Sequence, residues 1–133
     1  MKVTELRIGN WVCENELVDN EVWHQWVIGI GIKEDDDIWV SNCDIYKASE
    51  LHPIPLTKKW LKKFGFKKGN NGNYWIDLQA HYLELVQSNE YWYPVYVREP
   101  EMSYEDGQRV NLNRIKYVHE IQNLYFVLAG KDF

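Results

Sequence analysis

The sequence predicts an α+β fold: a small N-terminal β-barrel, a short basic helix, an antiparallel β-meander and a C-terminal amphipathic helix packed on the sheet. Three observations predict it: short β-branched and aromatic runs between polar turns, one lysine-rich helical segment, and apolar residues at helical spacing near the C-terminal end. A chain of 133 residues is long enough for one compact domain. We therefore expect the barrel, residues 1–52, and the helix–meander–helix part, residues 53–133, to form one compact unit.

The first region carries three candidate strands. Leu6–Val12 is a strand entry, Val22–Ile32 is a longer β-branched and aromatic run, and Ile38–Val40 is a return strand after an acidic turn. Gly29 and Gly31 inside the long run indicate a bulge, a sharp bend or a close backbone approach. Short strands with turn signals between them are typical of a small barrel or sandwich.

The spacing of Gly9, Val12, Gly29–Ile32 and Ile38–Val40 is similar to that of an SH3-like barrel of the KOW type. In such barrels, contact with nucleic acid relies on basic loops. The loops here are acidic, so the resemblance implies the fold and argues against nucleic-acid binding by this region. The acidic loop residues are Glu14, Glu16, Asp19, Glu21 and Asp35–Asp37.

A short helix is predicted after Leu51–Pro55, where two prolines one residue apart enforce an extended backbone. Thr57 provides the N-cap of a helix over Lys58–Phe64. Gly65 provides a left-handed C-cap, and Phe66 stands where a Schellman motif places its apolar contact. The residues of its apolar face are Trp60, Leu61 and Phe64.

The opposite face of this helix is a candidate electrostatic binding site. Four lysines on two turns repel one another, so something beyond helix stability favours them. One interpretation is contact with nucleic acid, nucleotide phosphates or an acidic protein; the other is a solvated face neutralised by the chain's own acidic segments. The candidate residues are Lys58, Lys59, Lys62, Lys63, Lys67 and Lys68.

An antiparallel meander is predicted to follow. Its strands are Tyr74–Leu78, His81–Gln87 and Tyr91–Val97, and Ser88–Glu90 is a plausible hairpin loop. Pro94 cannot donate to a ladder, so the third strand is expected to be an edge or to bend there. The segments beyond it are a polar loop or turn, Glu99–Gln108, and a last short strand, Arg109–Leu112.

The aromatic residues of the meander are a second candidate binding site. Tyr91, Trp92 and Tyr93 could form a platform for a base, a peptide or a sugar ring, together with Tyr96 and the strand at Tyr74. The alternative is that cross-strand aromatic pairs stabilise the sheet.

The C-terminal helix is predicted to follow an N-cap at Asn111 or Asn113 and to end at Gly130. Its core face is wide, and it carries a second stripe at helical spacing. The sheet could bury that stripe; otherwise it is a partner-binding or self-association face, or part of a ligand pocket around the histidine. The core face holds Tyr117, Val118, Ile121, Leu124, Tyr125, Leu128 and Ala129, and the second stripe holds Ile115, His119, Gln122 and Phe126.

Charge is distributed unevenly along the chain. Residues 1–50 carry a net charge of −7, residues 51–76 carry +6 from six lysines, and residues 77–133 carry −4. The whole chain, at −5, is repelled by nucleic acid, but a local lysine cluster can still contact phosphate. We therefore expect a protein partner or self-association, with nucleic acid as an alternative through the lysines.

No catalytic or metal-binding motif stands out. The four histidines have no recognised ligand spacing, the serines form no nucleophile elbow, and no glycine-rich phosphate loop occurs. Cys13 and Cys43 are expected to be small core residues, although a three-dimensional site with His24 is an alternative. We expect no cofactor and no metal, and the sequence favours a binding role over an enzyme.

The location expected is the cytoplasm. No run approaches the roughly 18 apolar residues of a membrane span, and the N-terminal residues lack a hydrophobic signal core. Two cysteines without Cys-x-x-Cys spacing fit a reducing compartment.

Three blocks of the chain, Glu5–Val12, Pro53–Phe66 and Tyr117–Phe126, occur in a fairly specific order and spacing. They resemble a family of small uncharacterised proteins encoded in prophages and integrated mobile elements of Bacteroidota. In that family the two residues after the capping threonine are often acidic, whereas Lys58 and Lys59 stand here. The resemblance implies a genomic setting and no mechanism.

The leading functional prediction is a non-enzymatic interaction protein of phage or mobile-element origin that binds a host or phage macromolecule, in an anti-defence or regulatory role. One alternative is a nucleic-acid-binding accessory protein that uses the lysine helix. The other is a small enzyme acting on a nucleotide or a cell-wall fragment.

Overall fold

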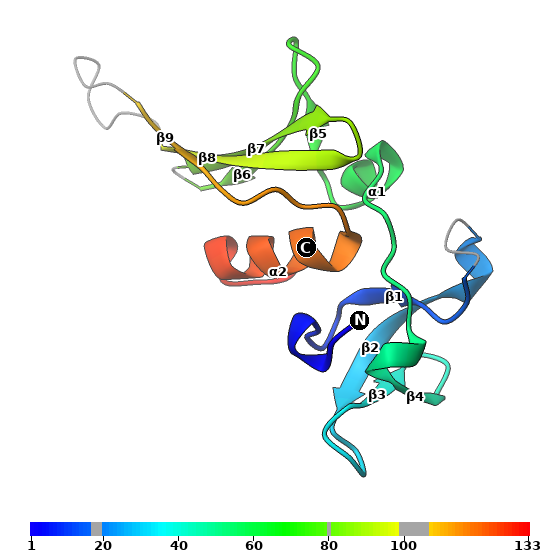
Figure 1. Cartoon of the computed structure of the whole chain (residues 1–133). Coiled ribbons are helices and arrows are strands. Elements are labelled where there is room, and N and C mark those ends of the chain that lie inside the picture. Colours follow the sequence, from blue (N-terminus) through cyan, green and yellow to red (C-terminus); the bar gives the residue numbers. More distant parts are fainter. Residues whose placement is uncertain (17–19, 80, 99–106) are drawn as a thin grey trace. The chain divides into compact units, whose positions relative to one another are not determined.

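The computed structural model describes residues 1–16, 20–79, 81–98 and 107–133 and confirms an α+β fold (Figure 1). Its strands form two antiparallel sheets, and it has one long helix. Contacts divide the chain into two compact units: unit 1 is residues 1–56 with 117–132, and unit 2 is residues 57–116 with Phe133. The predicted division after residue 52 separates two continuous parts of the chain and stays a prediction. The contact-based units instead group the C-terminal helix with the N-terminal region.

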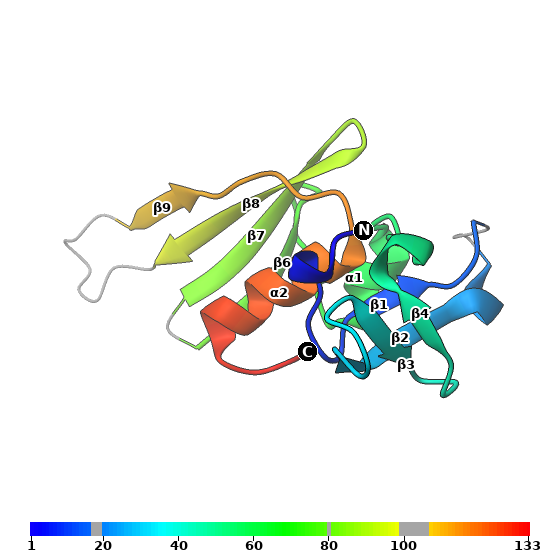
Figure 2. The same ribbon diagram turned by 60° about the horizontal axis from the view of Figure 1, so that its bottom comes forward.

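Unit 1 contains a four-stranded antiparallel sheet in the order β1-β2-β3-β4, which curls into a half-barrel (Figure 2). Three short 3-10 helices accompany it, and each begins from an extended residue. The strands are β1, Trp11–Cys13; β2, His24–Ile30; β3, Asp37–Val40; and β4, Ile45–Lys47. The 3-10 helices are η1, Val3–Glu5; η2, Glu21–Trp23; and η3, Ala48–Glu50.

The predicted irregularity at the glycines of β2 is confirmed. The register between β2 and β3 shifts between Val27 and Gly29, which is a β-bulge. A Cβ at Gly29 would lie 3.2 Å from Ile32 Cδ1 and 3.3 Å from Trp39 Cε3, so a side chain there would crowd both neighbours. Gly31 has φ +72°, a left-handed conformation that glycine adopts without strain.

The core of unit 1 lies on one side of this sheet. One valine from each of β1, β2 and β3 is fully buried there. Successive residues of a strand point to opposite faces, so the neighbours of these valines face outward. The buried cluster is Leu6, Val12, Val27, Ile38, Val40, Ala48 and Leu51, with Met1, Val3, Ile30 and Tyr46 packed against it.

The two cysteines differ. Cys13 is buried and exchanges backbone hydrogen bonds of 2.9 and 2.8 Å with His52. Cys43 is exposed in the turn before β4 and has φ +72°, so the prediction that it is a core residue is wrong. A thiol in a left-handed turn position has no strand face to turn toward the core.

Unit 2 begins with the predicted basic helix, α1, Lys58–Lys63. Thr57 caps it by accepting a hydrogen bond from the N–H of Trp60 at 3.4 Å. The N–H of Gly65 donates to Lys62 at 3.1 Å and that of Phe66 to Leu61 at 2.9 Å, which together form a Schellman motif. The predicted N-cap is therefore confirmed, and the helix ends at Lys63, one residue before the predicted Phe64.

The sheet of unit 2 has five antiparallel strands in the order β5-β6-β7-β8-β9, and the turn at Asn89 and Glu90 joins β7 to β8 as predicted. The edge prediction for Pro94 is wrong, because β8 lies between β7 and β9 and the Pro94 carbonyl accepts from the N–H of Leu112 at 2.9 Å. Of the predicted loop Glu99–Gln108, residues 99–106 lie outside the described part. The strands are β5, Lys67–Lys68; β6, Tyr74–Leu78; β7, His81–Ser88; β8, Tyr91–Arg98; and β9, Gln108–Asn111.

The long helix, α2, spans Val118–Ala129 and ends at Gly130 with φ +73°, as predicted. Its predicted N-cap at Asn111 or Asn113 is wrong, because the N-cap is Tyr117. Ile115 and Trp92 exchange two backbone hydrogen bonds of 2.8 Å, which hold the preceding segment extended. Among the described residues, no helix is long and apolar enough to cross a membrane.

Candidate binding surfaces

The six predicted lysines all lie in unit 2, on α1 and on β5, and all are exposed. Two of them cover aromatic rings: Lys63 Nζ lies 4.6 Å from the Trp60 ring centroid, and Lys67 Nζ lies 5.1 Å from that of Trp75. Trp60 and Leu61 are buried, so the predicted two-sided character of α1 is present. Whether the lysines bind a polyanion stays a prediction.

The aromatic residues of the predicted platform on β8 do not all lie on one face of the sheet, because successive strand residues point to opposite faces. Trp92 is buried and packs edge-on against Tyr74 at 6.0 Å between ring centroids. Tyr91 and Tyr93 point to the other face, where Arg114 lies 4.0 Å from the Tyr91 ring centroid. The three consecutive aromatics therefore do not share one surface, and Tyr93 is the most exposed of them.

The second stripe is not a continuous helical face. Ile115 precedes α2 and is buried in unit 2, while His119 and Gln122 are buried residues of unit 1. Phe126 is 38% exposed, and the guanidinium of Arg7 lies 4.1 Å from its ring centroid. The interface role of these four residues stays a prediction, but three of them are already covered by the chain.

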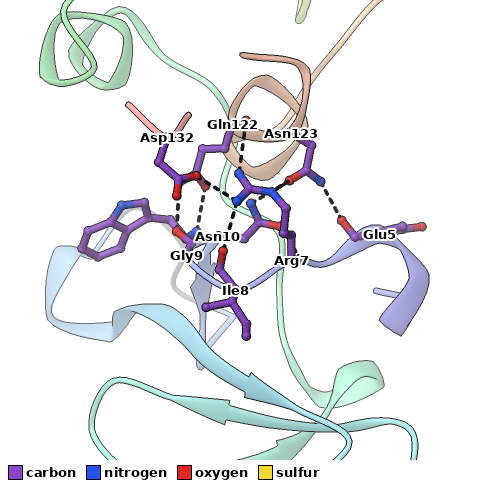
Figure 3. Close-up of polar contacts among 9 residues, drawn as sticks. Glu5, Arg7, Ile8, Gly9, Asn10, Gln122, Asn123 and Asp132 are labelled. Atoms are coloured by element: carbon purple, nitrogen blue, oxygen red, sulfur yellow. Dashed lines mark hydrogen bonds and ion pairs between the residues drawn. The ribbon is translucent and has the colours of Figure 1, made fainter. Parts of the chain in front are cut away.

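A polar network explains the burial of Gln122 (Figure 3). Its side chain donates to the carbonyl of Gly9 at 3.0 Å and accepts from the N–H of Trp11 at 2.8 Å. Asn123 accepts from the Asn10 side chain at 2.9 Å and donates to the carbonyl of Glu5 at 3.0 Å. The polar groups of α2 therefore satisfy the backbone that leads into β1, a structural role that sequence spacing alone did not predict.

Arg7 completes this network. Its guanidinium forms an ion pair of 2.8 Å with Asp132 and donates to the side chain of Asn123 at 3.3 Å. Figure 3 shows the links to Asn123 and Asp132. The contact of Arg7 with the Phe126 ring adds a third point of the C-terminal segment. These contacts join two of the three sequence blocks that carry the family resemblance.

His119 lines a cavity of about 400 Å³ in unit 1 together with Thr4, Glu5 and Glu120. Its ring stacks on that of Tyr117 at 5.9 Å, and its buried Nδ1 has no hydrogen-bond partner within the described residues. Burial lowers the pKa of His119, although the negative charges of Glu120 and Glu5 act in the opposite direction. Burial therefore favours the neutral form of the imidazole.

One lysine contacts three carboxylates of the acidic turn before β3, so the turn keeps a net negative charge. Lys47 Nζ lies 2.6 Å from carboxylate oxygens of Glu34 and Asp37 and 3.2 Å from one of Asp36. The hydrogen bond from Lys47, with backbone donors at Glu34 and Lys33, lowers the pKa of Asp37 to about 2, and the same carboxylates raise the pKa of Lys47. The three carboxylates lie close enough to hold a metal ion, but an ammonium group already contacts all three.

An exposed apolar surface lies on the outer side of the four-stranded sheet. Trp26 is 46% exposed, Trp39 38% and Ile45 48%, and Trp11 packs edge-on against Trp26 at 5.3 Å. The register pairs Trp11 with Trp26 and Trp39 with Ile45, so each pair shares a face. We call these four residues the tryptophan face.

A sequence signal for the tryptophan face exists and was missed. The dipeptide Trp-Val occurs three times before residue 41, and in each case the valine is fully buried in the core. Because strand residues alternate between faces, the preceding tryptophan must point away from that core. The three dipeptides are Trp11-Val12, Trp26-Val27 and Trp39-Val40.

A groove of about 530 Å³ lies on one face of the five-stranded sheet. The register pairs Trp75 with Glu84 and Asp77 with Tyr82, so all four side chains project to the same face. The turn at residues 69–73 closes one end of the groove with asparagine side chains. We call this feature the sheet groove.

Glu84 is largely buried in the sheet groove and is held by three donors. Asn73 Nδ2 lies 2.7 Å and Asn71 Nδ2 3.4 Å from its Oε1, and Arg109 lies 3.3 Å from its Oε2. Asp77 is exposed, and its carboxylate forms no ion pair or hydrogen bond with another described residue. The groove therefore combines one satisfied carboxylate, one available carboxylate and two aromatic rings.

Comparison with known proteins adds no identity to these surfaces. No family model, curated protein or solved structure matches the chain.

Proposed function

We propose that the protein is a non-enzymatic binding protein whose tryptophan face docks a basic segment of a protein partner. The observation that carries the proposal is the outward orientation of Trp11, Trp26 and Trp39 from three adjacent strands. Large exposed apolar patches on soluble proteins commonly mark interaction sites, and tryptophan is the residue most enriched among the dominant contacts of interfaces.

The charge around this face selects the partner. Residues 1–50 carry a net charge of −7, and the turns that join the strands are acidic, at Glu34–Asp36 and at Asp44. The cations of a lysine- or arginine-rich segment would form ion pairs with the carboxylates at the rim of the face and cation–π contacts with its indole rings. A second copy of this chain would oppose one acidic rim with another, so a heterologous partner is favoured over self-association.

Selection from a random peptide library displayed on phage tests this proposal. Peptides rich in lysine and arginine with an apolar anchor are expected to be enriched on the wild-type protein. Trp26→Ser and Trp39→Ser should each weaken a selected peptide about thirtyfold, as for a dominant interface tryptophan. Val127→Ser is the matched control, because Val127 is 78% exposed and lies on α2.

Two results would contradict the proposal. One is enrichment of acidic or neutral peptides, and the other is equal binding by the tryptophan variants and the control. The sedimentation coefficient could instead increase with protein concentration for the wild type and not for Trp26→Ser. That result would show that the tryptophan face binds a second copy of the chain rather than a different protein.

A second candidate function, binding of a polyanion such as nucleic acid, is supported by the lysines of unit 2. All six are exposed, and none of Lys58, Lys62 and Lys68 forms an ion pair with another described residue. Binding through this cluster predicts a steep decrease in affinity with salt. Replacing Lys58, Lys59, Lys62 and Lys63 by Glu should abolish it, whereas Lys33→Glu with Lys131→Glu should not; equal binding by both variants would eliminate this function.

We also propose two finer features of the fold, an SH3-like barrel in unit 1 and packing of α2 on the meander sheet. An SH3-like barrel for unit 1 is supported by four short antiparallel strands that curl around one core. Packing of α2 on the meander sheet and a mobile-element origin with an anti-defence or regulatory role stay predictions from the sequence.

A further inference from the structure

The sheet groove belongs to unit 2, whereas the tryptophan face belongs to unit 1. Its volume of about 530 Å³ falls within the range of pockets that take small ligands or a side chain. The walls are side chains of two paired strands, β6 and β7, so the groove is built on a rigid scaffold. Any ligand chemistry is set by the groups that these strands present.

A cation already lies near the ring of Trp75, which lines the groove. Lys67 Nζ lies 5.1 Å from the ring centroid of Trp75, and Tyr82 meets the same indole edge-on at 6.5 Å. An ammonium over an indole is attracted by the negative potential of the ring face. Lys67 is exposed at the end of a two-residue strand, so a competing cation can displace its side chain.

The polar part of the groove favours positive charge as well. The charge of Glu84 is matched by Arg109, with Asn73 and Asn71 as additional donors. Asp77 lies one residue pair further along the same face and keeps its carboxylate available. A cation on Trp75 would therefore have an acceptor beside it, provided by the carboxylate of Asp77.

We propose that the sheet groove binds an organic cation, a guanidinium or alkylammonium group, which stacks on Trp75 and donates hydrogen bonds to Asp77. The group takes the position that Lys67 occupies in the free protein. The same chemistry is offered by a small amine and by an arginine or lysine side chain of a peptide.

A neutral sugar is the main competing ligand, because it also stacks on indole and bonds to carboxylates and amides. The cation is favoured for two reasons. The ring face is occupied by an ammonium in the free protein, and a sugar would leave the negative charge of Asp77 without a counter-charge.

Amide chemical-shift titration of the full chain tests the proposal. The probes are agmatine, which carries a guanidinium and an ammonium group, tetramethylammonium, a blocked Gly-Arg-Gly peptide and methyl β-glucoside as the neutral control. Agmatine is expected to shift the amides of β6 and of the 69–73 turn, with an affinity that decreases as salt increases. If agmatine shifts these amides and the peptide does not, the ligand is a small molecule. If the peptide shifts them and agmatine does not, the ligand is a side chain of a partner protein.

Three variants make the test specific. Asp77→Asn should weaken agmatine about tenfold, because it removes the available carboxylate. Lys67→Ala should strengthen agmatine about two- to fivefold, because it removes the competing cation. Glu90→Gln, on the turn between β7 and β8, removes one negative charge of the same sheet outside the groove and should change nothing.

The proposal is overturned if methyl β-glucoside shifts the groove and the cations do not, if no cation shifts it, or if Lys67→Ala weakens agmatine. Asp77 and Lys67 are exposed, so their variants are expected to fold. The double variant Trp26→Ser/Trp39→Ser should leave the titration unchanged. The groove and the tryptophan face can therefore fail independently.

Discussion

The two sheets of this protein use tryptophan in opposite ways. In the four-stranded sheet, Trp26 and Trp39 follow the alternation outward and leave a large part of each ring in solvent. In the five-stranded sheet, Trp92 is turned inward onto Tyr74 and is almost completely buried, while Trp75 lines a polar groove. The same side chain thus lies on an exposed sheet face, in a core and in a polar groove.

The difference is set by which neighbour of each tryptophan the core requires. In unit 1 the following valine occupies the core, so the indole faces outward. In unit 2, Trp92 has the same parity as Leu83 and Leu85 across the ladder, and all three are buried. Composition alone does not distinguish these cases. They are distinguished by which face of the sheet each tryptophan points to, and this follows from the alternation of side chains along the strand.

The largest expected effect is a difference in stability between the two kinds of tryptophan. Trp92→Ala should lower the free energy of unfolding by about 3–5 kcal/mol, because it leaves a cavity beside Tyr74. Trp26→Ala should cost only about 1 kcal/mol, mainly the edge contact with Trp11. Urea unfolding of both variants measures the difference, and equal losses would refute the contrast between the buried and the exposed tryptophan.

The bulge of β2 offers a second way to probe the tryptophan face. Gly29→Ala places a Cβ within 3.3 Å of Trp39 and should destabilise the protein by about 1–3 kcal/mol through crowding. Adding Trp39→Ala should recover part of that loss, because it removes one of the two crowded neighbours. The coupling follows from a double-mutant cycle by urea unfolding, and strictly additive losses would show that Trp39 is not the neighbour that matters.

Acid should weaken the protein through His119. Its pKa is lowered from about 6.5 by burial in the folded state, so the unfolded chain binds a proton that the folded chain does not. Stability is therefore expected to decrease as the pH falls from 7.5 through 6.5 toward the lower, folded-state pKa. His119→Gln should flatten this part of the profile of unfolding free energy against pH, and an unchanged slope would exclude His119 as its source.

A smaller effect is expected at lower pH from the acidic turn of unit 1. The pKa of Asp37 is about 2 when folded and about 3.8 when unfolded, so its contribution is complete above the unfolded value. It should be lost as the pH falls from about 4 to about 2. Asp37→Asn should remove this pH dependence, whereas Asp44→Asn is the control at an exposed position that contacts no lysine among the described residues. Identical profiles would contradict the role of Lys47.

Much of the fold was visible in the sequence because local signals determined it. Thr57 and Gly65 set the ends of α1, and the strands of the meander were predicted to within one residue because hairpin turns bound them. The start of α2 was missed because Ile115 pairs with Trp92, a contact between segments more than twenty residues apart. Long-range pairing overrode local helical spacing there.

The candidate sites were less visible. The lysine cluster could be predicted because its members are adjacent in sequence. The sheet groove could not, because Trp75 and Glu84 become neighbours only once the register of β6 and β7 is known. The tryptophan face could have been predicted from the sequence. In each of the three Trp-Val dipeptides, a buried valine implies that the preceding tryptophan points to the opposite face of the strand.

The contacts of Arg7 and Gln122 carry a consequence for the order in which the protein is made. They close loops of more than 110 residues, and unit 1 is completed by residues 117–132, which follow residues 57–116 of unit 2. On the ribosome, the N-terminal sheet must wait for residues 117–132 before unit 1 is complete, whereas the strands of the second sheet all lie within residues 57–116 and can pair earlier. During synthesis the tryptophan face is therefore presented by an incomplete unit, which makes this stage the one most exposed to aggregation or to capture by a chaperone.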